Sequence, residues 1–151
     1  MPQSLVQIYL HTIFSTKNRQ PFLKEEKSRE RMHAYLAGIC QNLKCPALRI
    51  GGIEDHVHLL TRHYKNISVA VFLRELKRQS SKWIKTLNAE FENFAWQNGY
   101  GAFSLSPSHV KAVEKYIIGQ EEHHRQEAFQ EEFRRMCRKY GVEIDERYVW
   151  D

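Results

Sequence analysis

The stretch IEDHVHLL, residues 53–60, carries two histidines separated by a single valine within an apolar run. Such a run predicts a β-strand, in which successive side chains point to opposite faces of the sheet. His56 and His58 therefore share one face, while Val57 and Leu59 enter the core on the other. Because neutral imidazole is the commonest metal ligand among side chains, this strand is a candidate metal site.

Two interpretations of this stretch stay open on local grounds. Histidine pairs on strands also occur as half-exposed surface residues, and Glu54 and Asp55 could form no more than a polar turn before the strand. In the other interpretation, the two carboxylates ligate an ion or orient an imidazole from behind. The residues that favour a metal site lie far downstream.

Composition limits the class of protein. The chain has 151 residues, of which 42% are hydrophobic, and a formal net charge of +5. This is enough for one compact domain with a core, and the basic balance favours an anionic partner. The N-terminus lacks the pattern of a signal peptide and no apolar run reaches membrane-spanning length, so we expect a cytoplasmic protein with no membrane contact. The three cysteines fit neither a disulfide framework nor a zinc knuckle.

Hydrophobic periodicity predicts the elements around the histidine strand. Residues 5–14 are rich in β-branched and aromatic side chains and predict a strand. Residues 24–43 have the apolar spacing of an amphipathic helix, as do residues 68–87, which begin with a serine as N-cap. Short strands are expected at 47–52 and 102–105. The first of these is joined so tightly to the histidine strand that the two should pair antiparallel.

The C-terminal part is expected to be helical. Serine and proline at 106–107 stand at the cap and the first helical position, so a helix begins there and continues to at least Gln120. A second amphipathic helix follows up to Gly141. The tail beyond it is expected to dock on the domain through Tyr148 and Trp150.

This order of elements is strand, helix, strand, strand, helix, strand and then helices, which is that of a ferredoxin-like split βαβ arrangement. We expect an α+β fold with an antiparallel sheet, helices on one face, appended C-terminal helices, and the histidine strand in the middle of the sheet. One domain should span residues 1–151, with the C-terminal helix and tail from about residue 125 docked on it.

Basic residues gather on the second helix and in the loop after the first strand. The helix at 68–87 sets one acid, Glu75, against a nearly single-signed set of cations, which favours contact with a phosphate backbone. The loop at 15–21 is either a solvated turn or a phosphate contact. The candidate nucleic-acid-binding residues are Lys17, Arg19, Arg74, Lys77, Arg78, Lys82 and Lys85. Core packing is preferred to base stacking for three aromatic residues downstream, Trp96, Tyr100 and Phe103.

The segment KYIIGQ, residues 115–120, completes the pattern. Tyr116 and Gln120 are four residues apart and share one face of a helix. A glutamine carbonyl is an acceptable oxygen ligand, so Gln120 could complete a metal site with the histidine pair and place Tyr116 within reach of a phosphorus atom. Taken singly, each of the two is ordinary on a helix. Their joint occurrence with the histidine strand is what indicates function.

With these motifs in place, the chain resembles the single-tyrosine HUH transposases of the IS200-like insertion-sequence family. The resemblance rests on the His-hydrophobic-His strand, the Tyr-x-x-x-Gln helix and a basic chain of this length, and it covers essentially the whole sequence. It includes the opening strand that leads into STKNR at 15–19 and the segment WQNGYGAFS at 96–104.

The resemblance implies a DNA transposase, a nuclease and strand transferase that acts on single-stranded DNA with hairpin ends through a 5′-phosphotyrosine intermediate. By similarity, Tyr116 is the nucleophile and a divalent ion, Mg²⁺ or Mn²⁺, is held by His56, His58 and Gln120. The resemblance also implies a homodimer in which the tyrosine-bearing helix of one subunit is able to complete the site of the other.

The phenol of Tyr116 needs assistance as a nucleophile, because its unperturbed pKa of about 10 leaves it protonated at neutral pH. A divalent ion would offset charge on the scissile phosphate, and Lys111 and Lys115 would contact phosphate or favour the tyrosinate. Gly119 costs roughly 1 kcal/mol within a helix relative to alanine. We interpret it as the point that lets the helix shift between subunits.

Two other functions compete with this hypothesis. A domesticated relative would hold hairpin DNA or RNA without transposition, although a binding module has no need of the tyrosine, the glutamine and both histidines together. A small metal-dependent phosphoesterase would instead use the histidine pair with Glu54 or Asp55 to activate water. In that case the Tyr-Gln pair would be a coincidence.

Overall fold

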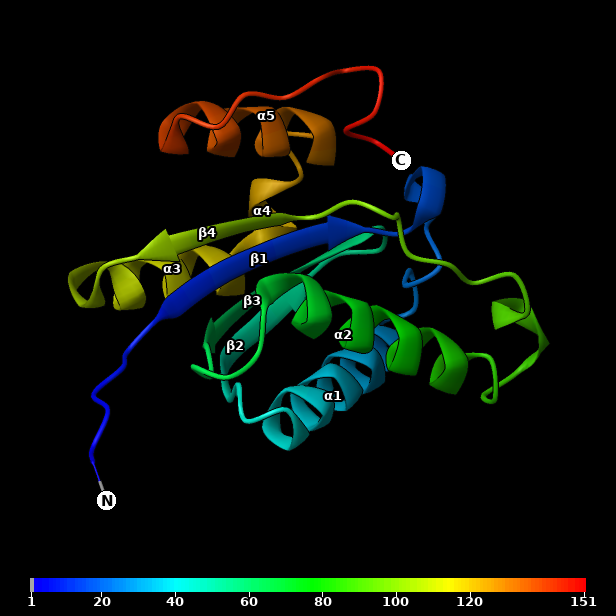
Figure 1. Ribbon diagram of the computed structural model, residues 1–151. Coiled ribbons are helices and arrows are strands. Elements are labelled where there is room, and N and C mark those ends of the chain that lie inside the picture. The colour runs from blue at the N-terminus through cyan, green and yellow to red at the C-terminus, as the bar shows by residue number, and fades with distance from the viewer. Residues whose placement is uncertain (1) are drawn as a thin grey trace.

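The computed structural model describes residues 2–151, and Figure 1 shows a sheet with helices against both of its faces. The strands pair antiparallel in the order β2-β3-β1-β4, which confirms the expected α+β, ferredoxin-like arrangement with the histidine strand inside the sheet. The strands are β1 Tyr9–Ser15, β2 Ala47–Gly52, β3 His56–Arg62 and β4 Gly101–Leu105. The helices are α1 Glu26–Asn42, α2 Val69–Ile84, α3 Val110–Ile118, α4 Gln120–His123 and α5 Phe129–Tyr140. Short 3₁₀ turns lie at Lys17–Arg19, Ala89–Phe91 and Pro107–His109.

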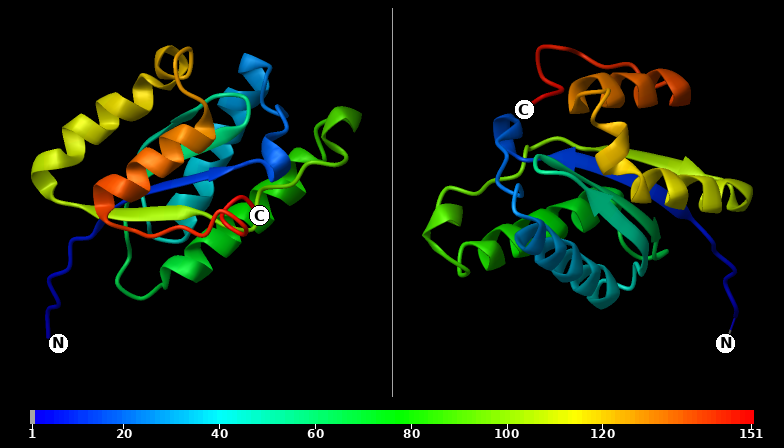
Figure 2. Two further views of the ribbon diagram at one scale, coloured as in Figure 1. Left: turned by 90° about the horizontal axis from the view of Figure 1, so that it is seen from above. Right: turned by 180° about the vertical axis from the view of Figure 1, so that it is seen from behind.

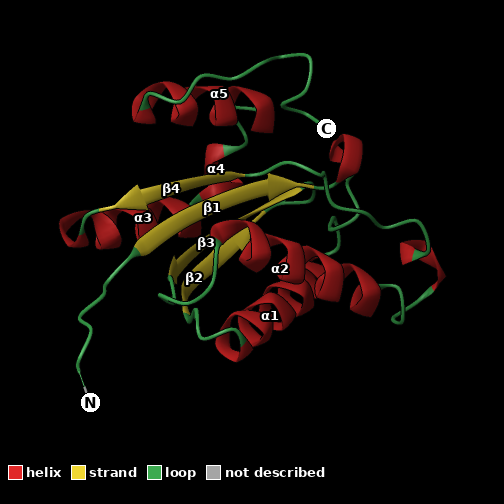
Figure 3. Ribbon diagram, viewed as in Figure 1, coloured by secondary structure: helices red, strands yellow, loops and turns green. Residues whose placement is uncertain are grey.

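The larger core lies between the sheet and helices α1 and α2 (Figure 3). Alternation along β1 and β3 sends Phe14, Val57 and Leu59 into this core, where all three side chains are fully buried. Met32 of α1 and Phe72 of α2 meet them from the helical layer. The prediction that the apolar residues of the histidine strand face the core, opposite the imidazoles, is confirmed.

The other face of the sheet is covered by the C-terminal helices (Figure 2): α3 packs on β2 and β3, and α5 lies over β1 and β4. A smaller core joins Ile13 of β1 to Phe129 and Phe133 of α5. Trp150 packs on both phenylalanines with ring centroids 6.4 and 5.8 Å away, as expected for the tail. Tyr148 is 64% exposed, so the expectation that it docks with Trp150 is wrong.

The expected helix from residue 106 onward is interrupted twice. The 3₁₀ turn Pro107–His109 precedes α3, and the oxygen of Ser106 bonds within this turn to His109 Nδ1 at 2.7 Å instead of capping a backbone N–H. α3 then ends at Ile118, and Gly119 separates it from α4. Glycine is common at such a break because its backbone loses more conformational entropy in a helix than that of any other residue. Gln120 therefore opens a new helical turn instead of continuing the tyrosine helix.

The second helix follows its capping signal. Ser68 accepts a hydrogen bond from the N–H of Val71 at 3.1 Å, as an N-cap does. The helix ends at Ile84, short of the expected residue 87. The backbone N–H groups of Thr86 and Leu87 still bond in single turns beyond it, so the periodic apolar pattern outlasts the regular helix.

Core packing accounts for two of the three aromatic residues considered for base stacking. Trp96 packs edge-on against Phe14 and donates from its indole N–H to Ser80 Oγ at 2.9 Å. Trp96 and Phe103 are 6% and 5% exposed, whereas Tyr100 keeps 38% of its surface. Only Tyr100 is therefore open enough to meet a base.

The cysteines are buried free thiols, namely Cys40, Cys45 and Cys137. Within residues 2–151, no helix combines the length and the apolarity needed to cross a membrane. Because all three cysteines are free thiols, the two apolar cores and the hydrogen bonds stabilise this fold without a disulfide.

Lys77 serves the fold. Its ammonium donates to the carbonyl oxygens of Gln97, Asn98 and Gly99 at 2.9, 3.0 and 2.6 Å, and it lies 5.1 Å from the ring centroid of Phe14. Burial lowers the pKa of Lys77 to about 8. Because this ammonium group binds the loop that leads into β4, we do not keep Lys77 among the residues expected to contact DNA.

Replacing Lys77 with methionine keeps most of the aliphatic stem but deprives three carbonyl oxygens of their donor. We expect Lys77→Met to lower the free energy of unfolding by about 2 kcal/mol, as for hydrogen bonds to a charged group, in a urea titration. Lys82→Met, at an exposed position of the same helix, should lower it by less than about 0.5 kcal/mol. Equal effects of the two substitutions would contradict the structural role of Lys77.

Candidate metal and tyrosine site

The histidine strand presents both imidazoles to the sheet face that α3 and α5 cover, and both side chains are completely buried. Asp55 Oδ1 lies 2.8 Å from His56 Nδ1. This carboxylate therefore accepts the Nδ1–H and aims the Nε2 of His56 into the site. Glu54 does not share this position: its carboxylate makes no hydrogen bond within residues 2–151, and its carbonyl oxygen accepts from the N–H of Leu23 at 3.0 Å.

Strand β1 supplies a partner for the second imidazole that sequence reasoning missed. His11 Nε2 lies 2.8 Å from His58 Nδ1, and His11 is 3% exposed. Burial lowers the pKa of His11 to about 3 and that of His58 to about 4, so both imidazoles are neutral at pH 7. The alternation of side chains along β1 could have revealed His11. It shares a face with Ile13, and Ile13 pairs in register with His58 on the neighbouring strand.

Gln120 reaches the histidines because α3 lies very close to β2. Gly51, paired in register with His58, has no side chain, and a Cβ there would come within 2.7 Å of the carbonyl oxygen of Ile117. The close approach leaves Gln120 Oε1 3.0 Å from His56 Nε2, with the glutamine 1% exposed. The structure thus brings together the two histidines and the glutamine that the sequence singled out.

The C-terminal segment adds two residues that the sequence reasoning missed. Glu132 Oε1 lies 2.9 Å from His124 Nε2, 3.1 Å from His58 Nε2 and 3.3 Å from His56 Nε2. The ligand atoms of these four residues all lie within 4.8 Å of one another. Glu132 falls one helical turn after Phe129, on the buried face of α5, where a carboxylate must find partners. That position was the signal in the sequence.

The buried carboxylate governs the electrostatics of the cluster. Burial alone would raise the pKa of Glu132, but hydrogen bonds from His124, His56 and His58 outweigh it and hold this pKa well below its usual range. Burial likewise acts to lower the pKa of His56, yet hydrogen bonds to Asp55 and Glu132 raise it to about 9. The cluster therefore contains an ionised carboxylate opposite a protonated imidazole, and a bound cation would take the place of that proton.

Tyr116 lies at the edge of this cluster. Its hydroxyl donates to Glu132 Oε2 and accepts from an Nη of Arg135 at 2.8 Å. The same hydroxyl lies 3.3 Å from His123 Nε2, and the ring centroid of Tyr116 lies 5.8 Å from that of His58. Burial and the adjacent carboxylate raise the pKa of Tyr116 above its usual value, so the phenol is protonated. Sequence reasoning missed both Arg135 and His123 as neighbours of the tyrosine.

The donor set suits a divalent cation. Imidazole nitrogens of three histidines, one carboxylate oxygen of Glu132 and the amide oxygen of Gln120 converge on one buried volume. Nitrogen and oxygen ligands accept several divalent ions, among them Mg²⁺ and Mn²⁺, and do not by themselves select one. The residues present therefore fit the kind of ion that the sequence suggested.

The basic residues predicted for DNA binding lie in three places. Lys17 and Arg19 follow β1, and the N–H of the neighbouring Thr16 donates to the carbonyl of Asp55 at 2.8 Å, so this turn lies at the histidine end of the sheet. Helix α2 covers the opposite sheet face (Figure 1) and exposes Arg74, Arg78 and Lys82, and Lys85 is exposed at its C-cap. The tyrosine helix exposes Lys111 and Lys115.

Comparison with known proteins finds one family and a shared fold. The family model described as "Transposase IS200 like" matches residues 4–120. Among curated proteins, none matches the chain. The family match spans the histidine strand, the tyrosine and the glutamine, and it ends before the segment that carries Glu132.

Two solved structures are similar in fold. A candidate transposase of Deinococcus radiodurans R1 gives a TM-score of 0.62 at 18% sequence identity, over 80% of this chain and 95% of that chain. A REP-associated tyrosine transposase bound to a REP hairpin gives a TM-score of 0.60 at 12% identity, over 82% of this chain and 73% of that chain. At these identities the likeness concerns the fold alone.

The adjacent carboxylates of Asp55 and Glu54 provide a matched pair of variants for the metal site. We expect Asp55→Asn to weaken Mn²⁺ binding about 10- to 100-fold, because an uncharged amide supports the Nδ1–H of His56 poorly. Glu54→Gln should leave the Mn²⁺ affinity unchanged. The affinities can be compared by isothermal titration or by the electron paramagnetic resonance signal of free Mn²⁺. Equal Mn²⁺ affinities of the two variants would show that Asp55 does not orient a metal ligand.

Proposed function

Because this chain belongs to the family of IS200-like transposases, we propose that it cuts and rejoins single-stranded DNA through a covalent bond between Tyr116 and a 5′ phosphate. One observation carries the proposal. Within a single chain, the hydroxyl of Tyr116 and the imidazoles of His56 and His58 contact the same carboxylate, that of Glu132. A nucleophile and a candidate metal site are thus adjacent.

In this proposal His56, His58 and Gln120 hold the divalent ion, Mg²⁺ or Mn²⁺. His124 and Glu132, which the sequence did not suggest, add a nitrogen and a carboxylate oxygen to the same donor set. When bound, such an ion supplies positive charge that offsets the charge developing on the scissile phosphate and on the leaving oxygen. The remaining chemistry comes from side chains of the chain itself.

Tyr116 attacks the phosphorus of a phosphodiester. The phenolic oxygen forms a bond to phosphorus, the bond from phosphorus to the 3′ oxygen of the preceding nucleotide breaks, and this oxygen takes up a proton as it leaves. Glu132 is the candidate acceptor of the phenolic proton, because the hydroxyl donates its hydrogen bond to Glu132 Oε2. His123 Nε2 lies 3.3 Å from the same hydroxyl and 2.9 Å from Glu127 Oε1. Arg135 donates to the phenolic oxygen at 2.8 Å, which stabilises negative charge on it.

The covalent product retains a phosphodiester linkage. A second 3′-OH that enters the site attacks the 5′-phosphotyrosine, releases the phenol and joins two DNA ends without an external energy source. The site that cuts is therefore also the site that joins, as excision and integration of an insertion sequence require. This reversibility distinguishes the proposal from simple hydrolysis.

We further propose that the substrate carries hairpin ends. A structural relative is bound to a REP hairpin, and this chain has a net charge of +5. Lys17 and Arg19 lie at the histidine end of the sheet, in a position to contact phosphates near the cut. The cations of α2 lie on the other sheet face, where they could hold a stem at a distance from the site.

A homodimer with a shared tyrosine helix stays a prediction. In this structure one chain alone brings Tyr116 to its own histidines, so exchange is not required to assemble the site. A Cβ at Gly119 would make only ordinary contacts, the nearest at 3.5 Å. The glycine is therefore not required by close packing, and its place between α3 and α4 is compatible with a hinge.

The competing functions fit the site less well. A phosphoesterase in which Asp55 activates water would need this carboxylate to face the ligand atoms, but Asp55 contacts the outer nitrogen of His56. A domesticated hairpin-binding protein would have no use for a tyrosine buried against a metal site. Both alternatives are separated from the proposal by whether a covalent adduct forms.

The test uses single-stranded DNA from the palindromes that flank the gene, labelled at its 3′ end and incubated with Mn²⁺. We expect a labelled protein band on a denaturing gel. Tyr116→Phe should abolish this band, because the substitution removes only the attacking oxygen. Tyr148→Phe, at a tyrosine that is 64% exposed, should leave the band unchanged.

The two alternatives predict other patterns in the same assay. Cleavage by Tyr116→Phe at the rate of the parent would support water as the nucleophile and contradict the proposal. Binding of the hairpin by the parent with neither cleavage nor adduct would support a non-catalytic binding protein. His56→Ala should lose the adduct while retaining hairpin binding.

A further inference from the structure

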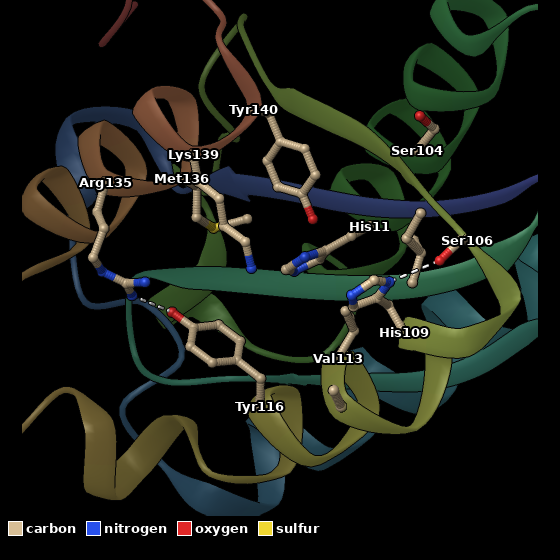
Figure 4. Close-up of a pocket in the computed structure, with 12 residues that line it drawn as sticks. His11, Ser104, Ser106, His109, Val113, Tyr116, Arg135, Met136, Lys139 and Tyr140 are labelled. Atoms are coloured by element: carbon tan, nitrogen blue, oxygen red, sulfur yellow. Dashed lines mark hydrogen bonds between the residues drawn. The ribbon is translucent and has the colours of Figure 1, made fainter.

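A cavity of about 440 Å³ opens beside Tyr116 (Figure 4). It lies between the end of β4, the 3₁₀ turn that follows, α3 and α5. Tyr116 and His11 form part of its wall, with their rings in an edge arrangement and their centroids 6.3 Å apart (Figure 4). Of the residues that line this cavity, the proposed reaction uses only Tyr116 and Arg135.

The cavity is the open side of the catalytic tyrosine. His56, His58 and Gln120 are at most 1% exposed, so the histidine side of the site is closed to solvent. Tyr116 is half-buried and lines the cavity. A group that fills the cavity therefore lies against the nucleophile.

The wall of the cavity carries positive charge. Arg135 and Lys139 of α5 both line it, and no aspartate or glutamate does. Figure 4 shows the Lys139 side chain extending toward His11 and the guanidinium of Arg135 beside the hydroxyl of Tyr116. Among residues 2–151, Lys139 makes no salt bridge, whereas Arg135 pairs with Glu127 at 3.1 Å. The occupant that this charge favours is an anion.

The rest of the wall suits a flat, largely apolar body. Tyr140 lines the cavity, and its ring is fixed by stacking on Phe103 with centroids 4.6 Å apart. The remaining apolar lining comes from Leu105, Ala112, Val113 and Met136. Aromatic side chains of this kind stack on nucleic-acid bases in a sequence-tolerant way. The volume is within the range for sites that hold a small organic ligand.

We propose that this cavity binds the nucleotide on the 3′ side of the cut, with its 5′ phosphate at Arg135 and Tyr116 and its base against Tyr140. The proposal rests on the proposed function, since it takes Tyr116 as the nucleophile. The attacking and leaving oxygens lie roughly in line across phosphorus. The nucleotide that keeps the phosphate is therefore free to extend along the cavity, away from the leaving oxygen.

The test uses the methyl group of Met136 as a reporter. The chain has three methionines, and Met32, buried in the core beneath the opposite sheet face, is an internal reference. Methionine-methyl ¹³C-labelled protein is titrated with thymidine 5′-monophosphate. We expect the Met136 signal to shift with saturation and the Met32 signal to stay in place.

Two variants locate the site. Lys139→Ala removes the cation of the cavity wall that has no salt bridge within residues 2–151 and should weaken the binding of the phosphate-bearing thymidine 5′-monophosphate about tenfold, the scale of one charge-assisted interaction. Lys27→Ala, at an exposed lysine of α1, should leave the affinity unchanged. Val113→Trp fills the cavity and should abolish the shift. This second variant tests the site independently of any effect that Lys139→Ala has on the fold.

Two further probes decide what is bound. Thymidine 3′-monophosphate should bind at least about fivefold more weakly than the 5′ isomer, because its phosphate sits at the wrong end for Arg135. A shift of equal size with inorganic phosphate alone would reduce the cavity to a simple anion site and overturn the proposal. The absence of any shift at Met136 would overturn it as well.

The titration needs neither metal nor cleavage, so its outcome is separate from that of the adduct assay. If the covalent adduct forms but the methyl signal of Met136 does not shift, only the proposal of the nucleotide cavity is refuted. A specific shift at Met136 without any adduct refutes the role of Tyr116 as nucleophile.

Discussion

The buried carboxylate of Glu132 is the contact through which the histidine strand and the tyrosine helix meet. One of its oxygens lies among the Nε2 atoms of His56, His58 and His124, and the other accepts from the hydroxyl of Tyr116. A carboxylate without solvent is costly unless it is paired and hydrogen-bonded. Its partners therefore fix α5 over the sheet and set the protonation of the whole site.

The antiparallel sheet determines which side chains reach this carboxylate. Its period of two residues sends His56 and His58 to the same face, and β1, the neighbour of the histidine strand, adds His11 behind His58. Gly51 lets α3 approach β2 closely enough for Gln120 to enter. Residues on three strands thus contribute to one site. They meet there only because the strand order places β1, β2 and β3 side by side.

The sequence predicted the parts of this site that depend on local periodicity. The facing of His56 and His58 follows from the alternation of side chains along a strand, and the order of elements placed the histidine strand inside the sheet. The grouping of Gln120 with the histidines was a hypothesis, and its contact with His56 depends on the close approach of α3 to β2 at Gly51. Glu132 was missed. Its place on the apolar face of α5 is visible in the sequence, but its partners depend on how α5 crosses the sheet, which spacing does not show. The break at Gly119 was also missed, since the spacing of Tyr116 and Gln120 was assigned to one continuous helix.

The same limit applies to charge. Lys77 belongs to a row of cations on α2 by sequence, yet its ammonium is bound by three carbonyl oxygens of a loop about twenty residues downstream. Spacing shows which helical face a residue occupies but not which distant loop will pack there. The sequence therefore locates the two histidines better than it locates the individual residues that would contact DNA.

The central claim is that the phenol of Tyr116 and the histidine pair act at one centre, and peptide mapping of the covalent adduct tests it most directly. Trypsin releases Tyr116–Arg125 as one peptide with a single tyrosine. After reaction with single-stranded DNA in Mn²⁺ and digestion of the DNA by nuclease, mass spectrometry should find a nucleotide phosphate on this peptide in the parent and not in His58→Ala. A nucleotide on any other tyrosine, or an unchanged yield of the modified peptide in His58→Ala, would contradict the account.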